Sequence, residues 1–576
     1  MSFPPRGSWR AGSVTGGLSR VPSPSTCSLP ARLEGMSARA PASGGPMLLA
    51  CCVIAFLIVA ALLAWVLVDH DYEAEYLALG TLLVRGDITL YQDEMTGQWM
   101  PLPFYFFGLS QAIFGPSLLV ARLLAVLLGA LVVVLIFALA ARWGGRLAGV
   151  AACGLFCTHG LVMGYFATAH FSPLVAALAL LAIYILFCTA WPARDLLAMA
   201  VFSVLFLVKP HYWPAIPFAL GYTVFRAGSW ARRAGLLAVA VSIPLLFFVW
   251  DRQHWKMLAY MPILRAWAEP MGYYSWHNLM EDPAAVWVSD YADIPWDPSP
   301  LGRLAGMAKS FAFFLRRYAI WMVAFVGLGA LAALRTWKGR TSTSLWRPTG
   351  LWFTFWLFWY LVAWQFVAVG VYIKQSYAYV GAIAPLLAIV IGCLFAAAWG
   401  RLELSVASRR LVAAAFLLAL IVSPWVHRSP YLPRRIVPAE AEIPALRAVA
   451  ARIAAVIPRG EQRVFLLGDP LPLHLAGRQS YLRQFHQHLM VFTSSRDPLR
   501  YHRAGMWGAA ELEGWLGSDA RYAVIEPNVL DFYGGRRPYV ELVARIDALL
   551  ARHFTLVETV RAGGDHVFRL YRRNAA

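Results

Sequence analysis

Residues 47–68 form an uninterrupted run of 22 residues without a single charged side chain. A helix needs about 20 apolar residues to cross a bilayer, and comparable runs recur along the chain. Of the 576 residues, 60% are hydrophobic and only 14% are charged, against roughly 45–50% and 25% in soluble proteins. These proportions exclude a soluble enzyme, a collagen-like chain and a disordered protein, and they indicate a polytopic helical membrane protein.

Hydrophobic segmentation predicts about eleven spans. The fifth and sixth are short, because Lys209 and Pro210 interrupt them. The expected spans are 47–68, 118–141, 147–166, 172–191, 196–210, 213–226, 233–250, 318–334, 351–371, 378–399 and 411–427.

The net charge of +19 could suggest a nucleic-acid binder, but the basic residues cluster in short loops between the apolar runs. Such loops favour the cytoplasmic side. With the N-terminus inside, the first outer loop, 69–117, carries seven acids and one base, Arg85. The asymmetry predicts a multi-pass protein of the cytoplasmic (inner) membrane, with a cytoplasmic N-terminus and an exported C-terminus. The seven cysteines show neither a disulfide framework nor zinc-site spacing.

Composition predicts three parts. Residues 1–46 are rich in Ser, Pro, Gly and Arg and are expected to be a disordered cytoplasmic tail. Residues 47–427 would form the transmembrane domain, with outer loops 69–117 and 251–317. Residues 428–576 would form a soluble extracytoplasmic α/β domain. Within this domain we expect helices over 439–457 and 541–553, strands over 463–467 and 522–526, and a hairpin of 554–560 with 566–571.

Four carboxylates follow the first span within seven residues, at Asp69, Asp71, Glu73 and Glu75. Outer loops are often acidic, so the cluster alone could be a solvated surface. Tyr72, Tyr76, Leu79 and Leu83 recur at helical spacing, which predicts a helix along the membrane surface with Asp69 and Asp71 at its start. A carboxylate fixed there can accept the proton of an acceptor hydroxyl.

An ordered set of short motifs surrounds this cluster. It runs through Asp69-x-Asp71-Tyr72-Glu73, Tyr76, Gly86, Tyr91-Gln92-Asp93, Pro101-Leu102-Pro103-Phe104-Tyr105, Phe114-Gly115-Pro116-Ser117, Ala121-Arg122-Leu123 and Ala140-Ala141-Arg142. The set resembles the opening of bacterial GT-C glycosyltransferases that use polyprenyl-phosphate sugars, such as the lipid A aminoarabinose transferases and the protein O-mannosyltransferases.

The resemblance implies a GT-C type fold and an inverting transfer from a polyprenyl-phosphate-linked sugar to an envelope glycan, lipid or protein. It implies a catalytic carboxylate in the first outer loop. Because Tyr72 separates Asp71 from Glu73, where the family has adjacent acids, that carboxylate could be Asp69 or Asp71, and Glu73 is a further catalytic candidate in the same patch. Ser172 stands where a second Asp often follows the third span. No cofactor is expected, and the question whether the reaction requires a divalent metal stays open.

A departing lipid phosphate needs a cationic partner in a low-dielectric site. Lys209 ends the fifth span and Lys374 follows the ninth, with Tyr377 close behind, while Arg316 and Arg317 adjoin the eighth. Ionisable residues at membrane depth are functional candidates, although lysines near span ends also extend harmlessly to the interface. The candidate donor-phosphate ligands are Lys209, Lys374, Arg316, Arg317 and Tyr377.

The acceptor and sugar are expected to contact Tyr91, Asp93, Trp276 and His170. Five tryptophans and several carboxylates in 251–308 suit sugar binding, although an interfacial aromatic belt has the same composition. The rival function is an envelope lipid or glycan transporter or flippase, which commonly shows internal repeats that this chain lacks. A non-catalytic scaffold would leave the acids and lysines unexplained. The expected partners are the lipid-linked donor, the envelope acceptor and membrane lipids, with no nucleic acid.

Overall fold

The structure is a computed structural model. It describes residues 45–68, 71–88, 100–250, 286–287, 300–337, 348–368, 376–400, 404–429, 432, 441–480, 491–494, 507–527, 537–562 and 566–575. For Asp71, Tyr72 and Tyr377 it describes the backbone only. The chain divides into a unit of residues 1–46 and a unit of residues 47–576. The boundary expected near residue 427 stays a prediction.

Each of the eleven ranges expected to span the membrane contains helix, and the range 147–166 contains two helices, α5 and α6. These helices are α1 (Gly45–Val66), α4 (Leu118–Gly144), α5 (Arg146–Thr158), α6 (Gly160–Phe166), α7 (Ser172–Cys188), α8 (Arg194–Val204), α9 (Ala215–Arg226), α10 (Trp230–Trp250), α15 (Ala319–Trp337), α16 (Thr349–Ala368), α17 (Ser376–Gly400) and α18 (Val406–Val426). Among the described residues, five helices are long and apolar enough to cross a bilayer, or up to seven if each bent pair is one span. The polytopic helical fold is thus confirmed, and the count of eleven stays a prediction.

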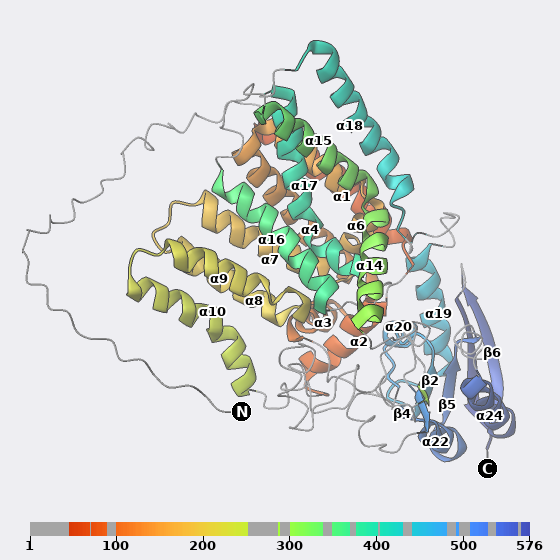
Figure 1. Cartoon of the computed structure of the whole chain (residues 1–576). Coiled ribbons are helices and arrows are strands. Elements are labelled where there is room, and N and C mark those ends of the chain that lie inside the picture. Colours follow the sequence, from red (N-terminus) through yellow and green to blue (C-terminus); the bar gives the residue numbers. More distant parts are fainter. Residues whose placement is uncertain are drawn as a thin grey trace, which may run out of the picture. The chain divides into compact units, whose positions relative to one another are not determined.

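Helix α17 lies at the centre of the helical region (Figure 1). An 18-residue apolar window of its segment Tyr379–Gly400 is fully buried inside the protein, whereas the corresponding window of α1 is 17% buried. It contacts α4, α5, α7, α15 and α16. At Gly392 a Cβ atom would lie 2.6 Å from the carbonyl oxygen of Ala148, so this glycine allows α17 and α5 to pack backbone against backbone.

Two of the long apolar segments are broken rather than straight. Helices α5 and α6 meet at 83° around His159, and the end of α14 (Pro300–Arg317) meets α15 at 87° around Tyr318. The His159 and Tyr318 rings are 4.9 Å apart, and His159 stacks on His427, at the end of α18, at 4.4 Å. Both breaks and one helix end therefore meet in a buried aromatic cluster.

The first outer loop contains two helices, α2 (Asp71–Arg85) and α3 (Pro101–Phe114), which pack on each other. The helix expected after residue 70 is confirmed, but its apolar stripe does not lie exposed on a surface. Tyr76, Leu79 and Leu83 are buried. The Tyr76 ring lies 5.0 Å from that of Phe104, because α3 supplies a second apolar face that covers the stripe.

The C-terminal region is an α/β structure, as expected. Its four-stranded sheet has the order β2-β5-β7-β6, with β2 parallel to β5 and the other neighbours antiparallel. A three-stranded sheet has the order β1-β3-β4. The elements are α19 (Glu442–Val456), β2 (Val464–Leu467), α20 (Leu471–Leu475), β3 (Val491–Ser494), β4 (Trp507–Gly508), α22 (Ala509–Gly514), the π-helix η8 (Trp515–Asp519), β5 (Tyr522–Ile525), α24 (Arg537–His553), β6 (Phe554–Ala562) and β7 (His566–Arg573), with β1 (Val286–Trp287) contributed from the long loop.

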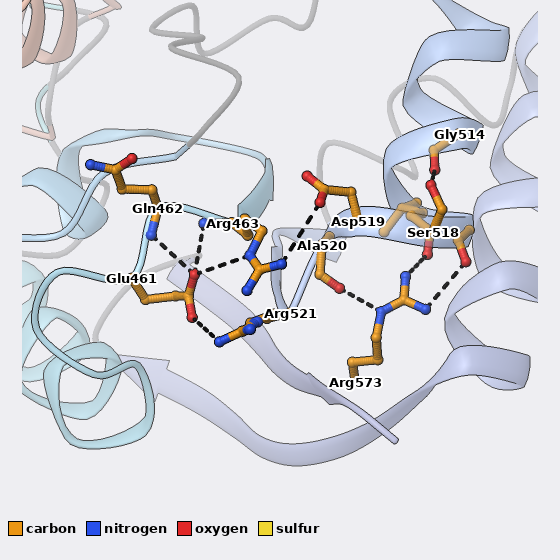
Figure 2. A network of polar contacts seen from close by, with 11 residues as sticks. Glu461, Gln462, Arg463, Gly514, Ser518, Asp519, Ala520, Arg521 and Arg573 are labelled. Atoms are coloured by element: carbon orange, nitrogen blue, oxygen red, sulfur yellow. Dashed lines mark hydrogen bonds and ion pairs between the residues drawn. The ribbon is translucent and has the colours of Figure 1, made fainter. Parts of the chain in front are cut away.

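Alternation along the strands builds two apolar layers. Phe465 and Leu467 of β2 join the cluster that contains residues of α24, while Val464 and Leu466 face the cluster formed with α19. At the end of β7, Arg573 donates to the carbonyls of Ala520, Gly517 and Leu516 at 2.6–3.2 Å (Figure 2). This arginine satisfies carbonyls at the end of η8, which would otherwise lack partners.

Candidate functional site

Four segments distant in sequence converge on one buried polar cluster. They are the first turns of α2, the corner 169–172 before α7, the 3-10 turns around Lys209, and the start of α17. Helix α8 ends at Val204 and continues as η2 (Leu205–Leu207) and η3 (Pro210–Tyr212). Pro210 lacks the N–H that a continuing helix would require, so the chain turns here and holds Lys209 inside the protein.

Glu73 and Arg122 form a fully buried ion pair with two parallel contacts. Arg122 Nε donates to Glu73 Oε1 at 2.9 Å and Nη2 donates to Oε2 at 2.6 Å. Arg122 Nη1 also donates to the carbonyls of Ala64 and Leu67, at the end of α1. The backbone N–H of Ala169 donates to Glu73 Oε1 at 2.7 Å. The pair therefore ties α1, α2, α4 and the 169–172 corner together.

Lys209 is 7% exposed, and aromatic rings and a carboxylate surround it. Its Nζ lies 5.1 Å from the centroid of the Phe171 ring and 5.8 Å from that of Tyr379. Glu75, one turn after Asp71 in α2, is 1% exposed and brings a second carboxylate to the buried cluster. Ring faces attract a cation most strongly when water is excluded, so this environment can hold a buried lysine beside an incoming anion.

The segment after Lys209 is fixed by contacts with α16 and α17. The Tyr212 hydroxyl donates to the carbonyl of Tyr379 at 2.7 Å. Gln365 Nε2 donates to the carbonyl of His211 at 3.0 Å, and the His211 ring stacks on that of Tyr379 at 4.0 Å. These contacts leave Lys209 little freedom to move, which favours a preorganised cationic site.

His170 is fully buried at the 169–172 corner. Its Nδ1 accepts the backbone N–H of Ser172 at 3.2 Å and lies 2.8 Å from the Ser172 hydroxyl. Because Nδ1 accepts a backbone N–H, the proton of the neutral ring lies on Nε2. Its ring contacts are with Tyr165 and Phe171. His170 thus orders the corner that carries Phe171 against Lys209.

The other predicted site residues are placed as follows. Asp71 is the first residue of α2, one turn before Glu75, and Tyr377 lies in the first turn of α17, two residues before Tyr379. Arg316 is exposed and Arg317 half-buried, at the end of α14. Asp69, Tyr91, Asp93, Trp276 and Lys374 lie outside the described residues.

Sequence reasoning did not assign roles to Arg122, Glu75 or Tyr379. Arg122 belongs to the Ala121-Arg122-Leu123 motif, and its partner Glu73 is 49 positions away, so no spacing rule could pair them. The one available signal for Arg122 was its charge inside an otherwise apolar stretch, which by itself marks a functional or structural position. No group of three or more potential metal ligands occurs in the described part of the chain.

Comparisons with known proteins find similar solved structures only. No family model matches the chain, and no curated protein matches it. The chain is similar to the crystal structure of ArnT from Cupriavidus metallidurans bound to undecaprenyl phosphate, with 14% identity, 93% of this chain and 99% of that chain covered, and a TM-score of 0.42. It is also similar to the Archaeoglobus fulgidus oligosaccharyltransferase in complex with Zn and sulfate, with 12% identity, 83% and 69% coverage, and a TM-score of 0.47. Neither similarity assigns a role to a residue of this chain.

Proposed function

We propose that the chain is an inverting membrane glycosyltransferase that moves a sugar from a polyprenyl-phosphate donor to a cell-envelope acceptor, at the outer face of the cytoplasmic membrane. The observation that carries the proposal is Lys209, a buried lysine whose Nζ lies 5.1 and 5.8 Å from the centroids of the stacked Phe171 and Tyr379 rings. The ordered motifs around α2 and α4, which resemble those of GT-C enzymes, support the same assignment.

In the proposed reaction, the acceptor hydroxyl oxygen forms a bond to the anomeric carbon of the sugar. Asp71 or Asp69 takes the hydroxyl proton. The bond between the anomeric carbon and the phosphate oxygen breaks, and the lipid phosphate leaves with the electron pair. Lys209 would stabilise the charge that develops on the leaving group, because a fixed cation acts strongly where water is excluded.

Within this proposal, Glu73 serves as a positioning residue rather than as the base. Both of its oxygens already accept hydrogen bonds from Arg122 or Ala169, and these contacts hold the start of α2 in place. Lys374, Tyr377, Arg316 and Arg317 remain candidates for the phosphate, and Tyr91, Asp93, Trp276 and His170 for the acceptor or sugar.

One observation favours the transporter alternative. Discontinuous helices are typical of secondary transporters, and two bent helix pairs occur here. The two functions differ in outcome: a transferase releases free polyprenyl phosphate and a new glycoside, whereas a flippase changes only the leaflet of an intact lipid-linked sugar.

The test uses the full-length protein in lipid nanodiscs, supplied with a panel of polyprenyl-phosphate sugars and envelope extracts. We expect release of polyprenyl phosphate with wild type and a large loss of kcat with Lys209→Ala. The matched control is Lys309→Ala, because Lys309 is an exposed lysine on α14. Lys209→Ala removes a positive charge but keeps the buried carboxylate of Glu75, so this variant can also lose activity by unfolding. The double variant Lys209→Met with Glu75→Gln removes both charges and therefore serves as the second test.

The carboxylates are tested by Asp71→Asn and Asp69→Asn, with Asp87→Asn as control, because Asp87 is exposed just beyond α2. An amide keeps a helix-start hydrogen bond but cannot take a proton. A general base contributes roughly 10²–10⁴-fold to the rate, and we expect the asparagine variant of the catalytic residue to lose this factor. Full activity of both Asn variants would refute the assignment, and flipping without release of phosphate would establish the transporter.

A further inference from the structure

A cavity of about 280 Å³ lies between one face of α2 and the loops around α20. Its α2 side is formed by Ala78, Thr81, Leu82 and Arg85, which recur at the spacing of one helical face. Its other side includes the 459–462 turn and the segment 470–480. Small-molecule sites run from about 300 to 1,000 Å³, so this cavity fits a single phosphate or monosaccharide-sized group.

Two arginines give this cavity a positive charge. Arg85 and Arg459 both line it, and both are exposed. Within the described part of the chain neither makes an ion pair. The third lining arginine, Arg478, donates to the carbonyls of Ile457, Ala476, Gly477 and Ala454 and so holds the wall in place.

The acid at the cavity edge, Glu461, is already paired with two other arginines. Glu461 accepts the backbone N–H groups of Gln462 and Arg463 at 3.1 and 3.0 Å. Its oxygens also lie 3.8 Å from the Arg463 guanidinium and 3.6 Å from that of Arg521, as Figure 2 shows. Its charge therefore does not cancel those of Arg85 and Arg459.

Two buried polar atoms of the lining have no partner among the described residues, His474 Nε2 and Ser480 Oγ. A ligand oxygen placed against either atom would supply the hydrogen-bond partner that it lacks. Burial, and secondly the charge of Arg85, lower the pKa of His474 to about 4. The ring is thus neutral at pH 7 and offers one N–H donor, while the Ser480 hydroxyl offers another.

We propose that this cavity is a binding site for an oxyanion group, a phosphate or carboxylate carried by a soluble sugar or by a lipid headgroup. Arg85 and Arg459 supply charge, and His474 and Ser480 are the polar groups of the lining that lack a partner among the described residues. Charge-assisted hydrogen bonds to phosphate and carboxylate are the strong ones. The site does not depend on the proposed glycosyl transfer, because its occupancy can be measured without turnover.

The test titrates glucose 6-phosphate against the full-length protein in phosphatidylcholine nanodiscs, by calorimetry, with glucose as the neutral reference. We expect saturable binding of the phosphate ester only. The exposed arginines allow substitutions that leave packing intact, so Arg85→Gln and Arg459→Gln should each weaken binding by about tenfold. Arg552→Gln, an exposed arginine at the end of α24, should leave binding unchanged.

A second titration in nanodiscs that contain phosphatidic acid identifies the source of the group. Weaker apparent binding of the sugar phosphate would assign the cavity to a lipid headgroup, and unchanged binding would assign it to a soluble ligand; either result supports the site. The proposal is overturned if no saturable binding occurs up to about 10 mM, or if Arg552→Gln weakens binding as much as Arg85→Gln.

Discussion

Single buried residues connect the helices of this protein. The Arg122 guanidinium makes four contacts that link Glu73 with the carbonyls of Ala64 and Leu67. Taking two charges out of water costs several kcal/mol per ion, so such a pair is retained only when its geometry is good and its remaining donors are satisfied. Here both conditions hold, and the pair fixes the start of α2, where Asp71 lies.

Arg122→Met should lower the unfolding free energy by about 3–5 kcal/mol, because it leaves Glu73 buried without its counter-charge. The apparent melting temperature of the purified protein in detergent measures the loss. Arg452→Gln is the matched control, since Arg452 pairs with Glu558 at the surface and is 56% exposed; its melting temperature should stay near wild type. Glu73→Leu with Arg122→Met should recover much of the loss, and an equal loss in the double variant would contradict this account.

The lowered pKa of His474 predicts how the stability of the fold changes with pH. Its pKa is lowered to about 4 by burial and by Arg85, whereas the unfolded chain has the ordinary value of about 6.5. The unfolded state therefore binds a proton as the pH falls below 6.5, and the folded state does not until near 4. At pH 5 this difference destabilises the fold by roughly 2 kcal/mol.

We therefore expect wild type to lose more melting temperature between pH 7.5 and pH 5 than His474→Gln, which has no proton to bind. Equal losses in the two proteins would show that His474 is accessible to protons in the folded state.

At the scale of elements, three faces of α2 contact three different parts of the protein. Glu73 and Glu75 face the buried polar cluster, Gly80 faces α3, and Arg85 faces the oxyanion cavity. At Gly80 a Cβ atom would overlap the carbonyl oxygen of Phe104 and would lie 2.9 Å from Gly108 Cα. Two glycines therefore allow α2 and α3 to approach backbone to backbone, which holds the candidate site against the helical region.

Gly80→Ala should destabilise the protein by about 1–3 kcal/mol, because the added methyl group meets backbone that cannot rotate away. Gly221→Ala is the control, since Gly221 lies inside α9 with no atom within 4 Å of its added Cβ. Alanine is the better helix former by roughly 0.5–1 kcal/mol, so this variant should melt at or above wild type. A Gly80→Ala protein that melts like wild type would refute the close crossing.

Local patterns in the sequence predicted most of the elements but few of the contacts between them. The helix after residue 70, the helices α19 and α24, and the β6–β7 hairpin follow from periodicity and turn residues, so they could be read directly. The breaks at His159 and Tyr318 could not be predicted, because a hydropathy average over about 20 residues is the same for a straight helix and for a bent pair. Lys209 and Glu73 were found as charges beside apolar runs. Their partners Tyr379 and Arg122 were not, because contacts across such sequence distances depend on how the helices pack.

At the scale of the whole molecule, several of the described turns that carry basic residues lie at one end of the helical region. Arg232, at the start of α10, pairs with Asp195 at the start of α8 and donates to the carbonyl of Pro192 at 2.6 Å. A Cβ at Gly350, where α16 begins, would lie 2.6 Å from Trp143 at the end of α4 and 3.0 Å from Phe187 at the end of α7. These are the ends that charge asymmetry assigns to the cytoplasm.

The last prediction is that this end is cytoplasmic and that the chain from Arg428 onward is exported. Helices α4 and α5 join through Gly145 alone, with φ of 87°, so their ends lie at one side, beside Arg142 and Arg146. An alkaline phosphatase fusion inserted after Gly145 should be inactive and a green fluorescent protein fusion there bright. Fusions after Ala576 should give the reverse, because an odd number of spans follows a cytoplasmic N-terminus. The same signal at both positions would refute the count of eleven spans, since positions on one side require an even number of crossings between them.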